Sequence, residues 1–200
     1  MQMQHTEQWH IDRLGKITAS RIKDLNAKPV KGKVLNRYLL ELLNERLTGL
    51  KTQTLITQDM QWGIDHEKNA ITAYENRHFC TVIPSGFINH PTIKNSGASP
   101  DGLVGDDGQI EIKCPSMPTH LNTLLLGEIP SDHLPQITWQ LAVTRRKWCD
   151  FISYDPRQIA PLQIFVKRVF AKDLPIANME QDVIACNDRL DNLIGNLLTG

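Results

Sequence analysis

The sequence predicts a mixed α/β fold in which helices flank a central sheet of parallel and antiparallel strands. Three observations favour it. Helical patterns open the chain, β-rich segments fill its centre, and one helical segment separates two groups of strands ahead of a last helix. With 200 residues and 40% hydrophobic positions, the chain can form a full core, so we expect one domain over residues 1–200.

Two helices and a loop are predicted near the start of the chain. Residues 17–26, ITASRIKDLN, have a short helical pattern, and residues 34–49 repeat leucine at helical spacing until a glycine ends the pattern. Between them, residues 27–33 combine Pro and Gly with lysines, which predicts a flexible loop. The loop and the start of the next helix carry a basic cluster, formed by Lys28, Lys31, Lys33 and Arg37.

A third helix is predicted at residues 65–78, and it directs an acid toward the core. Its apolar stripe consists of Ala70, Ile71 and Tyr74. Glu67 lies three residues before Ala70 and four before Ile71, on the same face. An inward-facing carboxylate requires a partner or a function.

Strands follow from residue 80 onward. The segment CTVIPSGFI at 80–88 and the stretch SPDGLVGDDGQIEIKCP at 99–115 are typical of strands. Residues 131–147 then have a helical pattern, with Asp132 as a candidate cap and Pro135 in the first turn. This helix separates the central strands from those that follow.

The last part of the chain predicts two strands and a helix. Residues 148–156 and 162–170 are β-rich, and an amphipathic helix runs from about Ile176 to Leu198. We expect its apolar stripe to pack on the core; the stripe consists of Met179, Val183, Cys186, Leu190 and Ile194.

Charge, cysteine content and hydropathy narrow the class of protein. The 22 lysines and arginines balance 22 aspartates and glutamates, so net charge neither indicates nor excludes a nucleic-acid partner. Four widely separated cysteines argue against a zinc or cluster site and favour free thiols. The start is polar, and we find no apolar run of the about 18 residues that a membrane span needs. We therefore expect a soluble intracellular protein without membrane contact.

The stretch SPDGLVGDDGQIEIKCP carries the densest chemistry. In the strand QIEIKC, the isoleucines and the cysteine share one face, while Glu111 and Lys113 share the other. If GDDG closes a four-residue hairpin loop, Asp101 lies across from about Ile112, next to Glu111 and Lys113. Two carboxylates and the Ile112 carbonyl then form an oxygen-only pocket, which suits Mg²⁺ or Mn²⁺ rather than zinc.

A lysine beside such a pocket has a defined chemical role. Lys113 can position or deprotonate a water, or stabilise the charge on a phosphate under attack. Taken singly, the pieces are ordinary, because SPDG is a common surface turn and E-x-K is often a solvent-facing ion pair. Combined, and with Glu67 as a further acid, they predict a metal site. An EF-hand is excluded, since Gly105 occupies one of its ligand positions.

Five residues resemble the signature of the PD-(D/E)xK nucleases, namely Pro100, Asp101, Glu111, Ile112 and Lys113. More of the chain is similar to the lambda-type phage alkaline exonucleases of the viral recombinase family. The motifs WHIDRLGKITAS, WGIDHEKNAITAYE, SPDGLVGDDGQIEIKCP and LPQITWQLAVTRRKWCDFISYDPR follow in the family's order over residues 9–157. The resemblance implies a restriction-endonuclease-like core in a single PD-(D/E)xK exonuclease domain.

By this resemblance, Asp101, Glu111 and the Ile112 carbonyl hold divalent metals. Glu67 completes the site from its helix, and Lys113 assists the attacking water. The implied reaction is two-metal hydrolysis of a phosphodiester, in which one ion generates hydroxide and both stabilise the developing charge. We expect two Mg²⁺ ions per site, with Mn²⁺ as a substitute.

The resemblance also implies residues that bind the substrate. In the family's R-x-G-x-x-x-x-S context, Arg13 and Ser20 receive the 5′-terminal phosphate, a role suited to an arginine fork beside a helix N-terminus. Gln136 and Gln140 match a helix-borne glutamine motif and are expected to contact DNA, although the sequence alone predicts only a polar helix face. The further candidates for DNA contact are Lys28, Lys31 and Lys33.

The implied activity is a Mg²⁺-dependent 5′-to-3′ exonuclease. It digests one strand of linear double-stranded DNA from 5′-phosphorylated ends and leaves 3′ overhangs for recombination by single-strand annealing. The resemblance further implies a ring-shaped homotrimer around the DNA, a phage single-strand annealing protein as partner, and a location in the cytoplasm of a bacterial host.

Alternative functions remain open at this point. A structure- or sequence-specific DNA endonuclease on the same core would cut closed circles and ignore a 5′ phosphate. A DNA-end binding or annealing accessory with a degenerate site would bind ends without metal-dependent product. A Cas4-like nuclease with an iron–sulfur cluster is disfavoured by the cysteine spacing.

The segment FINHPTIKNSGA lacks an acid that some relatives carry, so the second metal is expected to bind more weakly or through Glu67 alone.

Overall fold

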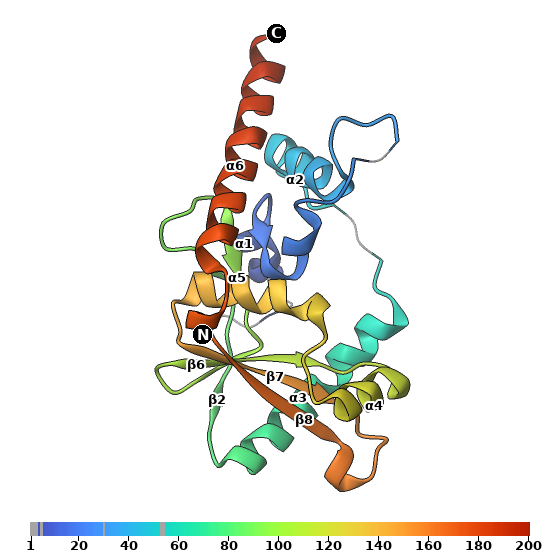
Figure 1. Cartoon of the computed structure of the whole chain (residues 1–200). Coiled ribbons are helices and arrows are strands. Elements are labelled where there is room, and N and C mark those ends of the chain that lie inside the picture. The colour runs from blue at the N-terminus through green and yellow to red at the C-terminus, as the bar shows by residue number, and fades with distance from the viewer. Residues whose placement is uncertain (1–3, 5, 30, 53–54) are drawn as a thin grey trace.

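A five-stranded mixed sheet lies at the centre of the computed structural model, which describes residues 4, 6–29, 31–52 and 55–200 (Figure 1). Its middle strands β6 and β7 are parallel, and every other neighbouring pair is antiparallel. The strand order is β2 (Val82–Ile83), β5 (Gly102–Val104), β6 (Gly108–Lys113), β7 (Trp148–Tyr154) and β8 (Ile164–Phe170).

A second, smaller sheet brings the N-terminal region to the segment that precedes β5. Its central strand β4 pairs in parallel with β1 and antiparallel with β3. The strands are β1 (Ile17–Thr18), β4 (Ser96–Ala98) and β3 (Ile88–Asn89). Because β4 ends two residues before Pro100, this pairing anchors the start of the predicted metal-binding stretch.

Helices cover both faces of the large sheet. Figure 1 shows α5 above this sheet and α3 below it, while α6 rises away from it beside α2. The α-helices are α1 (Glu7–Arg13), α2 (Arg37–Thr48), α3 (Gln58–His78), α4 (Met117–Leu126), α5 (Leu134–Thr144) and α6 (Ile176–Thr199). Short 3₁₀ helices connect them at η1 (Ala19–Asp24), η2 (Ser131–His133), η3 (Ala160–Leu162) and η4 (Ala171–Asp173).

Side chains of β6 alternate between the two faces of the sheet, so different residues of β6 face the helices on each side. One face of β6 packs against α3 in a core formed by Ala70, Tyr74, Val82, Ile110, Ile112, Ile152 and Tyr154. On the other face, α5 packs on β7 through Ile137, Leu141, Cys149 and Phe151. The predicted division of β6 into an isoleucine face and an acid–lysine face is therefore confirmed, and α5 lies over the second of these faces.

The predicted stripe of the last helix is confirmed at its centre. Val183 and Leu190 are fully buried, and Met179 and Cys186 pack against the same core. That core joins α6 to α2, η1 and the upper side of α5, where Trp139 is fully buried. Since α5 takes part in this core and in the one above β7, it connects the two halves of the molecule.

Several boundary predictions were wrong. Residues 17–26 form β1 and a 3₁₀ helix rather than an α-helix, and residues 80–88 divide into β2 and the start of β3, which belong to different sheets. The helix expected at 131–147 ends at Thr144, because Arg145 adopts the left-handed conformation. Asp132 is not its cap, since the N-cap position is His133.

The turn before β6 also differs from the prediction. Val104 pairs with Gly108, so the loop has three residues rather than four, and Gly105 adopts a positive φ of 52°. Gly102 pairs with Ile110, which sets Asp101 opposite Glu111 and not Ile112. The chain turns back one residue earlier than expected.

Three further sequence predictions concern the loop, the thiols and the membrane. The loop at 27–33 is exposed at its lysines, with Val30 outside the described residues. All four cysteines are free thiols, as expected. Among the helices that the structure describes, none has the length and hydropathy to cross a bilayer.

Candidate active site

The β5–β6 hairpin positions the two acids. A side chain at Gly102 would collide with Val82, and one at Gly108 would overlap the Trp148 ring, so both glycines allow the close approach of neighbouring strands. The Asp101 amide donates to the Ile110 carbonyl at 3.2 Å. Asp101 therefore extends the antiparallel pairing by one residue and lies beside Glu111.

The carboxylate of Asp101 turns toward the backbone of β6. Its Oδ2 accepts a hydrogen bond from the Ile112 amide at 2.6 Å. Because the N–H and C=O of a strand residue face the same neighbouring strand, the Ile112 carbonyl points to the same side as this carboxylate. Asp101 thus contacts the Ile112 backbone through the amide, and its predicted sharing of a metal ion with the Ile112 carbonyl stays a prediction.

Glu111 is a buried acid surrounded by donors. Its side chain is 1% exposed, and Oε1 lies 2.5 Å from the Lys113 ammonium. Gln136 Nε2 donates to Oε1 and Gln140 Nε2 donates to Oε2, each at 2.6 Å. Both glutamines thus bind the acid rather than forming an unpartnered polar face.

The two glutamines differ in their access to a substrate. Gln136 is partly exposed and lines a cavity, and its Oε1 accepts from Lys113 Nζ at 3.3 Å. Gln140 is 0% exposed, so its side chain presents no surface to a substrate. The expected direct contact of Gln140 with DNA is replaced by contact with Glu111.

A single cavity of about 630 Å³ collects the predicted catalytic residues. It lies beyond the C-terminal end of β6, between residues of α3 and residues of α5. Glu67 enters it from α3, and Thr119 from the start of α4. Of the predicted site residues, the cavity is lined by Arg13, Ser20, Glu67, Asp101, Glu111, Ile112, Lys113 and Gln136.

Electrostatics in the cavity are dominated by neighbouring acids. Burial raises the pKa of Asp101 well above its ordinary value, and the charges of Glu111 and Glu67 raise it further. Burial and the charge of Glu111 likewise raise the pKa of Glu67. Burial lowers the pKa of Lys113, but Glu111 and Asp101 outweigh it, so the pKa lies above its ordinary value. The acids therefore favour an additional positive charge beside Lys113.

The donor set fits a hard divalent cation. Three carboxylates and a backbone carbonyl supply only oxygen, which Mg²⁺ and Mn²⁺ prefer. In the described part of the chain, no group of three or more His, Cys, Asp or Glu side chains is arranged to hold a metal ion by itself. Asp101, Glu67, Glu111 and the Ile112 carbonyl are the groups that would hold such an ion, and Lys113 and the two glutamines orient the Glu111 carboxylate.

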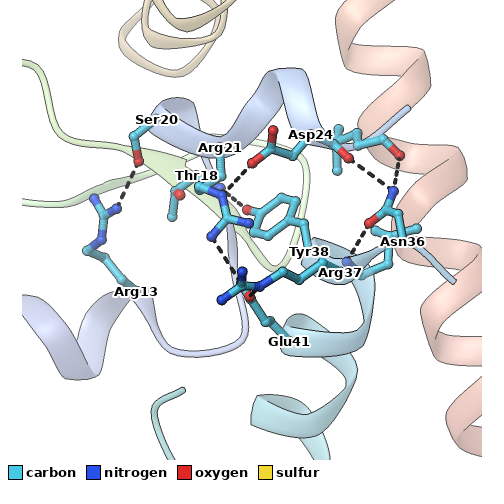
Figure 2. Close-up of polar contacts among 11 residues, drawn as sticks. Arg13, Thr18, Ser20, Arg21, Asp24, Asn36, Arg37, Tyr38 and Glu41 are labelled. Atoms are coloured by element: carbon cyan, nitrogen blue, oxygen red, sulfur yellow. Dashed lines mark hydrogen bonds and ion pairs between the residues drawn. The ribbon is translucent and has the colours of Figure 1, made fainter. Parts of the chain in front are cut away.

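The predicted phosphate-binding pair is brought together beside this site. Arg13 ends α1 and donates through Nη2 to Ser20 Oγ at 3.2 Å, as Figure 2 shows. Arg13 Nη1 also lies 3.4 Å from Ser99 Oγ, two residues before Asp101. Trp9 fixes the arrangement, because its Nε1 donates to the same Ser99 hydroxyl at 2.9 Å and its ring lies 4.1 Å from the guanidinium of Arg13.

Arg13 and Arg21 lie close in sequence but have different partners (Figure 2). Arg21 forms ion pairs with Asp24 and Glu41, at 2.5 Å and 3.0 Å. Within the described residues, Arg13 forms no ion pair and donates only to serine hydroxyls. Burial lowers the pKa of Arg13 to about 10, which leaves the guanidinium charged at neutral pH. A partly buried cation with neutral partners is suited to binding an anion.

The basic loop does not reach the cavity. Lys28 and Lys31 are exposed, and Lys33 lines a separate depression of about 370 Å³ together with Arg37. Figure 1 places this loop beside α2, at the opposite end of the molecule from the large sheet. Its expected contact with DNA stays a prediction.

Sequence reasoning missed the residues that support the phosphate pair and Glu111. Trp9 and Ser99 belong to quoted motifs, but no spacing rule connects residues 90 positions apart. Gln109 shares the face of Glu111 on β6 and is fully buried, a position where strand alternation could have indicated a polar partner.

The fold and the site define the class of this protein. A mixed sheet whose hairpin presents Asp101, Glu111 and Lys113 at the end of a central strand, with α-helices on both faces, is the core of a PD-(D/E)xK nuclease. Residues 8–147 match the family described as the YqaJ-like viral recombinase domain, and the chain belongs to this family. The predicted family is thereby confirmed.

Solved structures agree with this assignment. The alkaline exonuclease LHK-Exo from Laribacter hongkongensis is 42% identical, with a TM-score of 0.88 over 96% of both chains. LHK-Exo in complex with dAMP gives 41% identity, the same coverage of both chains and the same TM-score. A phage-related exonuclease from Haemophilus somnus 129PT shares the fold at 14% identity, with a TM-score of 0.67 over 91% of this chain and 96% of its own. No curated protein sequence matches the chain. The protein is thus a nuclease related to alkaline exonucleases, with the predicted restriction-endonuclease-like fold.

Proposed function

We propose that this protein is a Mg²⁺-dependent exonuclease that digests the 5′-ended strand of linear double-stranded DNA and prefers 5′-phosphorylated ends. Its product is a duplex with 3′ overhangs for recombination by single-strand annealing. The observation that carries the proposal is the position of Arg13 and Ser20 in the same cavity as Asp101, Glu111 and Lys113. An anion site beside the acids gives the cavity a means to recognise a DNA end.

The phosphate pair would select the end of the strand. Among the residues that the structure describes, Arg13 forms no ion pair with a carboxylate, and it has two hydroxyl groups within its reach. A terminal phosphate carries more negative charge than an internal phosphodiester and offers more oxygens to a guanidinium fork. From this difference we expect a preference for phosphorylated ends and no digestion of closed circles.

Lys113 and the acids would carry out the hydrolysis. Asp101, Glu111, Glu67 and the Ile112 carbonyl are the residues that would hold the divalent ions. When bound, Mg²⁺ activates the attacking water and stabilises the charge that develops on the scissile phosphate and leaving oxygen. Lys113 keeps its proton because of the adjacent acids, so it would hold the attacking water in line and stabilise phosphate charge as a cation.

Assembly and partners belong to the same proposal. A homotrimeric ring around the duplex would retain the DNA without a strongly basic surface, in agreement with a formal net charge of +0. The 3′ overhang would pass to a phage single-strand annealing protein in the bacterial cytoplasm. Sedimentation at micromolar concentration checks the trimer, and a monomer there would contradict it.

The polarity of digestion tests the proposed function. A linear duplex would carry a 5′ phosphate at one end only and distinguishable labels at both termini of that strand. We expect Mg²⁺-dependent release of the 5′ label as a mononucleotide before any loss of the 3′ label. EDTA serves as the control without product, and Lys113→Ala as the control with strongly reduced product. Release of the 3′ label first, or cleavage within the strand, would refute the proposal.

A further inference from the structure

A row of buried polar side chains extends from Glu111 away from the cavity. On β6, Gln109 and Glu111 lie two residues apart and share one face. On α5, Gln136, Gln140 and Thr144 recur every four residues and form one stripe that faces this strand. The two rows meet side chain to side chain, although apolar residues fill the neighbouring contact of α5 with β7.

The hydrogen bonds along the row all point in one direction. The Thr144 hydroxyl donates to Gln109 Oε1 at 2.7 Å, and Gln109 Nε2 approaches Gln140 Oε1 at 3.5 Å. Gln140 Nε2 then donates to Glu111 Oε2 at 2.6 Å. The middle link is longer than the usual N–H···O distance of about 2.9 Å, so it is the weakest of the three.

This direction fixes the orientation of each amide. Thr144 Oγ accepts from the Arg146 amide at 3.4 Å, so its proton is free to donate to Gln109. Gln109 must then present its NH₂ group to Gln140, and Gln140 must present its own to Glu111. If the Gln140 amide turned over, its oxygen would face the carboxylate, and the two NH₂ groups of Gln140 and Gln109 would meet.

Burial gives the row energetic weight. Gln109 and Gln140 are 0% exposed, and Glu111 is 1% exposed. A buried polar group without a hydrogen-bond partner costs about 1–3 kcal/mol. Each buried amide in the row therefore depends on the hydrogen bond to its neighbour. Gln109 and Thr144 do not line the cavity, and their hydrogen bonds lead to Glu111 through Gln140.

We propose that Thr144, Gln109 and Gln140 form a positioning relay that holds the Glu111 carboxylate in the rotamer required for metal binding. The inference rests on the proposed function and deepens it. Gln136 holds the opposite oxygen of Glu111 from the cavity side. The relay holds Oε2 from inside the protein, where neither DNA nor solvent competes for the contact.

The chain offers a matched pair of threonines for the test. Thr144→Val removes the hydroxyl that starts the relay while keeping the shape of the side chain. Thr138→Val is the control, because Thr138 is buried on the same helix but donates to the Leu134 carbonyl, outside the relay. Thr144→Ser keeps a hydroxyl and should restore the wild-type result. Gln140→Met breaks the link to Glu111 itself.

The measurements are the affinity for Mn²⁺, from the electron paramagnetic resonance signal of free Mn²⁺, and the Mg²⁺ concentration at half-maximal digestion. Loss of a partner that orients a metal ligand typically costs about 10- to 100-fold in affinity. We expect about tenfold for Gln140→Met and, across the weak middle link, about threefold for Thr144→Val. The apparent KM for DNA ends should stay unchanged, and thermal melting checks that each variant folds.

Two patterns would overturn the relay. One is equal Mn²⁺ affinity for Thr144→Val, Thr138→Val and the wild type together with an unchanged affinity for Gln140→Met. The other is a loss in Thr144→Val that Thr144→Ser does not restore. A wild type that binds Mn²⁺ but digests no DNA would refute the proposed function alone, since the Mn²⁺ affinities still decide the relay. A wild type that binds no Mn²⁺ would refute both.

Discussion

Replacing Arg13 with glutamine tests whether the structure contains a reader of DNA ends. Glutamine keeps a polar side chain that can contact Ser20 or Ser99, but it removes the positive charge. The structure gives a reason to expect a specific loss, because Arg13 pairs with serine hydroxyls and with no acid among the described residues. The charge is therefore available to a phosphate and not used for internal ion pairing.

The size of the effect follows from the contacts available. Hydrogen bonds to a charged group contribute about 1.5–3 kcal/mol. At about 1.4 kcal/mol for each factor of ten, the variant should lose about 10- to 150-fold of the advantage of phosphorylated ends. Loss of the contact with the Trp9 ring should lower the free energy of unfolding by about 0.5–1 kcal/mol. This change in stability is smaller than the expected loss in phosphate recognition.

The assay compares kcat/KM for linear duplexes with 5′-phosphate and 5′-hydroxyl ends, in the wild type and the variant. Arg21→Gln is the matched control, since Arg21 is bound to Asp24 and Glu41 and should leave the ratio of the two rates unchanged. An equal loss on both kinds of end in Arg13→Gln, or the same change of ratio in Arg21→Gln, would refute Arg13 as the phosphate reader.

Three further predictions follow from the site and the core. Lys113→Ala should lower cleavage by about 10²- to 10⁴-fold while DNA binding persists, and retained cleavage would remove the lysine from the mechanism. Mg²⁺ at 100 times its Kd should stabilise the wild type by about 2.7 kcal/mol in thermal melting, and Asp101→Asn should lose this stabilisation; equal stabilisation would exclude Asp101 as a ligand. Burial lowers the pKa of His90, which faces Glu180 and Arg145 and accepts two backbone N–H bonds through Nδ1. The unfolded chain then binds the proton more readily, so stability should be complete above about pH 6.5 and fall as pH drops toward the folded-state pKa. His90→Asn should flatten this slope below about pH 6.5 and leave stability at higher pH without a slope of its own; an unchanged slope below that pH would assign it to other groups.

Strand and helix periods predicted the composition of the site. The alternation of β6 separated Glu111 and Lys113 from the isoleucines, and the stripe of α3 indicated that Glu67 turns inward. Both inferences depend only on local geometry, which is why they hold in the structure.

The register of the hairpin could not be predicted because its turn is ambiguous. GDDG permits a loop of three or four residues, depending on whether Gly108 belongs to the loop or to β6. In the structure Gly108 belongs to β6 and pairs with Val104, where the lack of a side chain leaves room for the Trp148 ring. Trp148 is 40 residues away in sequence, so this contact exists only after β7 pairs with β6. The one-residue shift placed Asp101 opposite Glu111.

Helix α4 and the phosphate pair show two other limits. The MPTHLNTLLL segment contains a proline and two threonines, which weaken the helical signal, although Ser116 at its start and Gly127 with a positive φ of 63° mark its ends. The contact of Arg13 with Ser99 joins segments 86 residues apart, so no local pattern predicts it, and the family resemblance indicated only Arg13 and Ser20.

Digestion of three substrates side by side would decide whether the protein is the proposed exonuclease. They are a linear duplex with 5′ phosphates, the same duplex with 5′ hydroxyls, and a covalently closed circle, each with Mg²⁺ and with EDTA. We expect mononucleotides from the linear duplexes, released faster from the phosphorylated one, and no product from the circle or in EDTA. Nicking of the circle would establish an endonuclease instead, and binding of ends without any product would leave only a DNA-binding module.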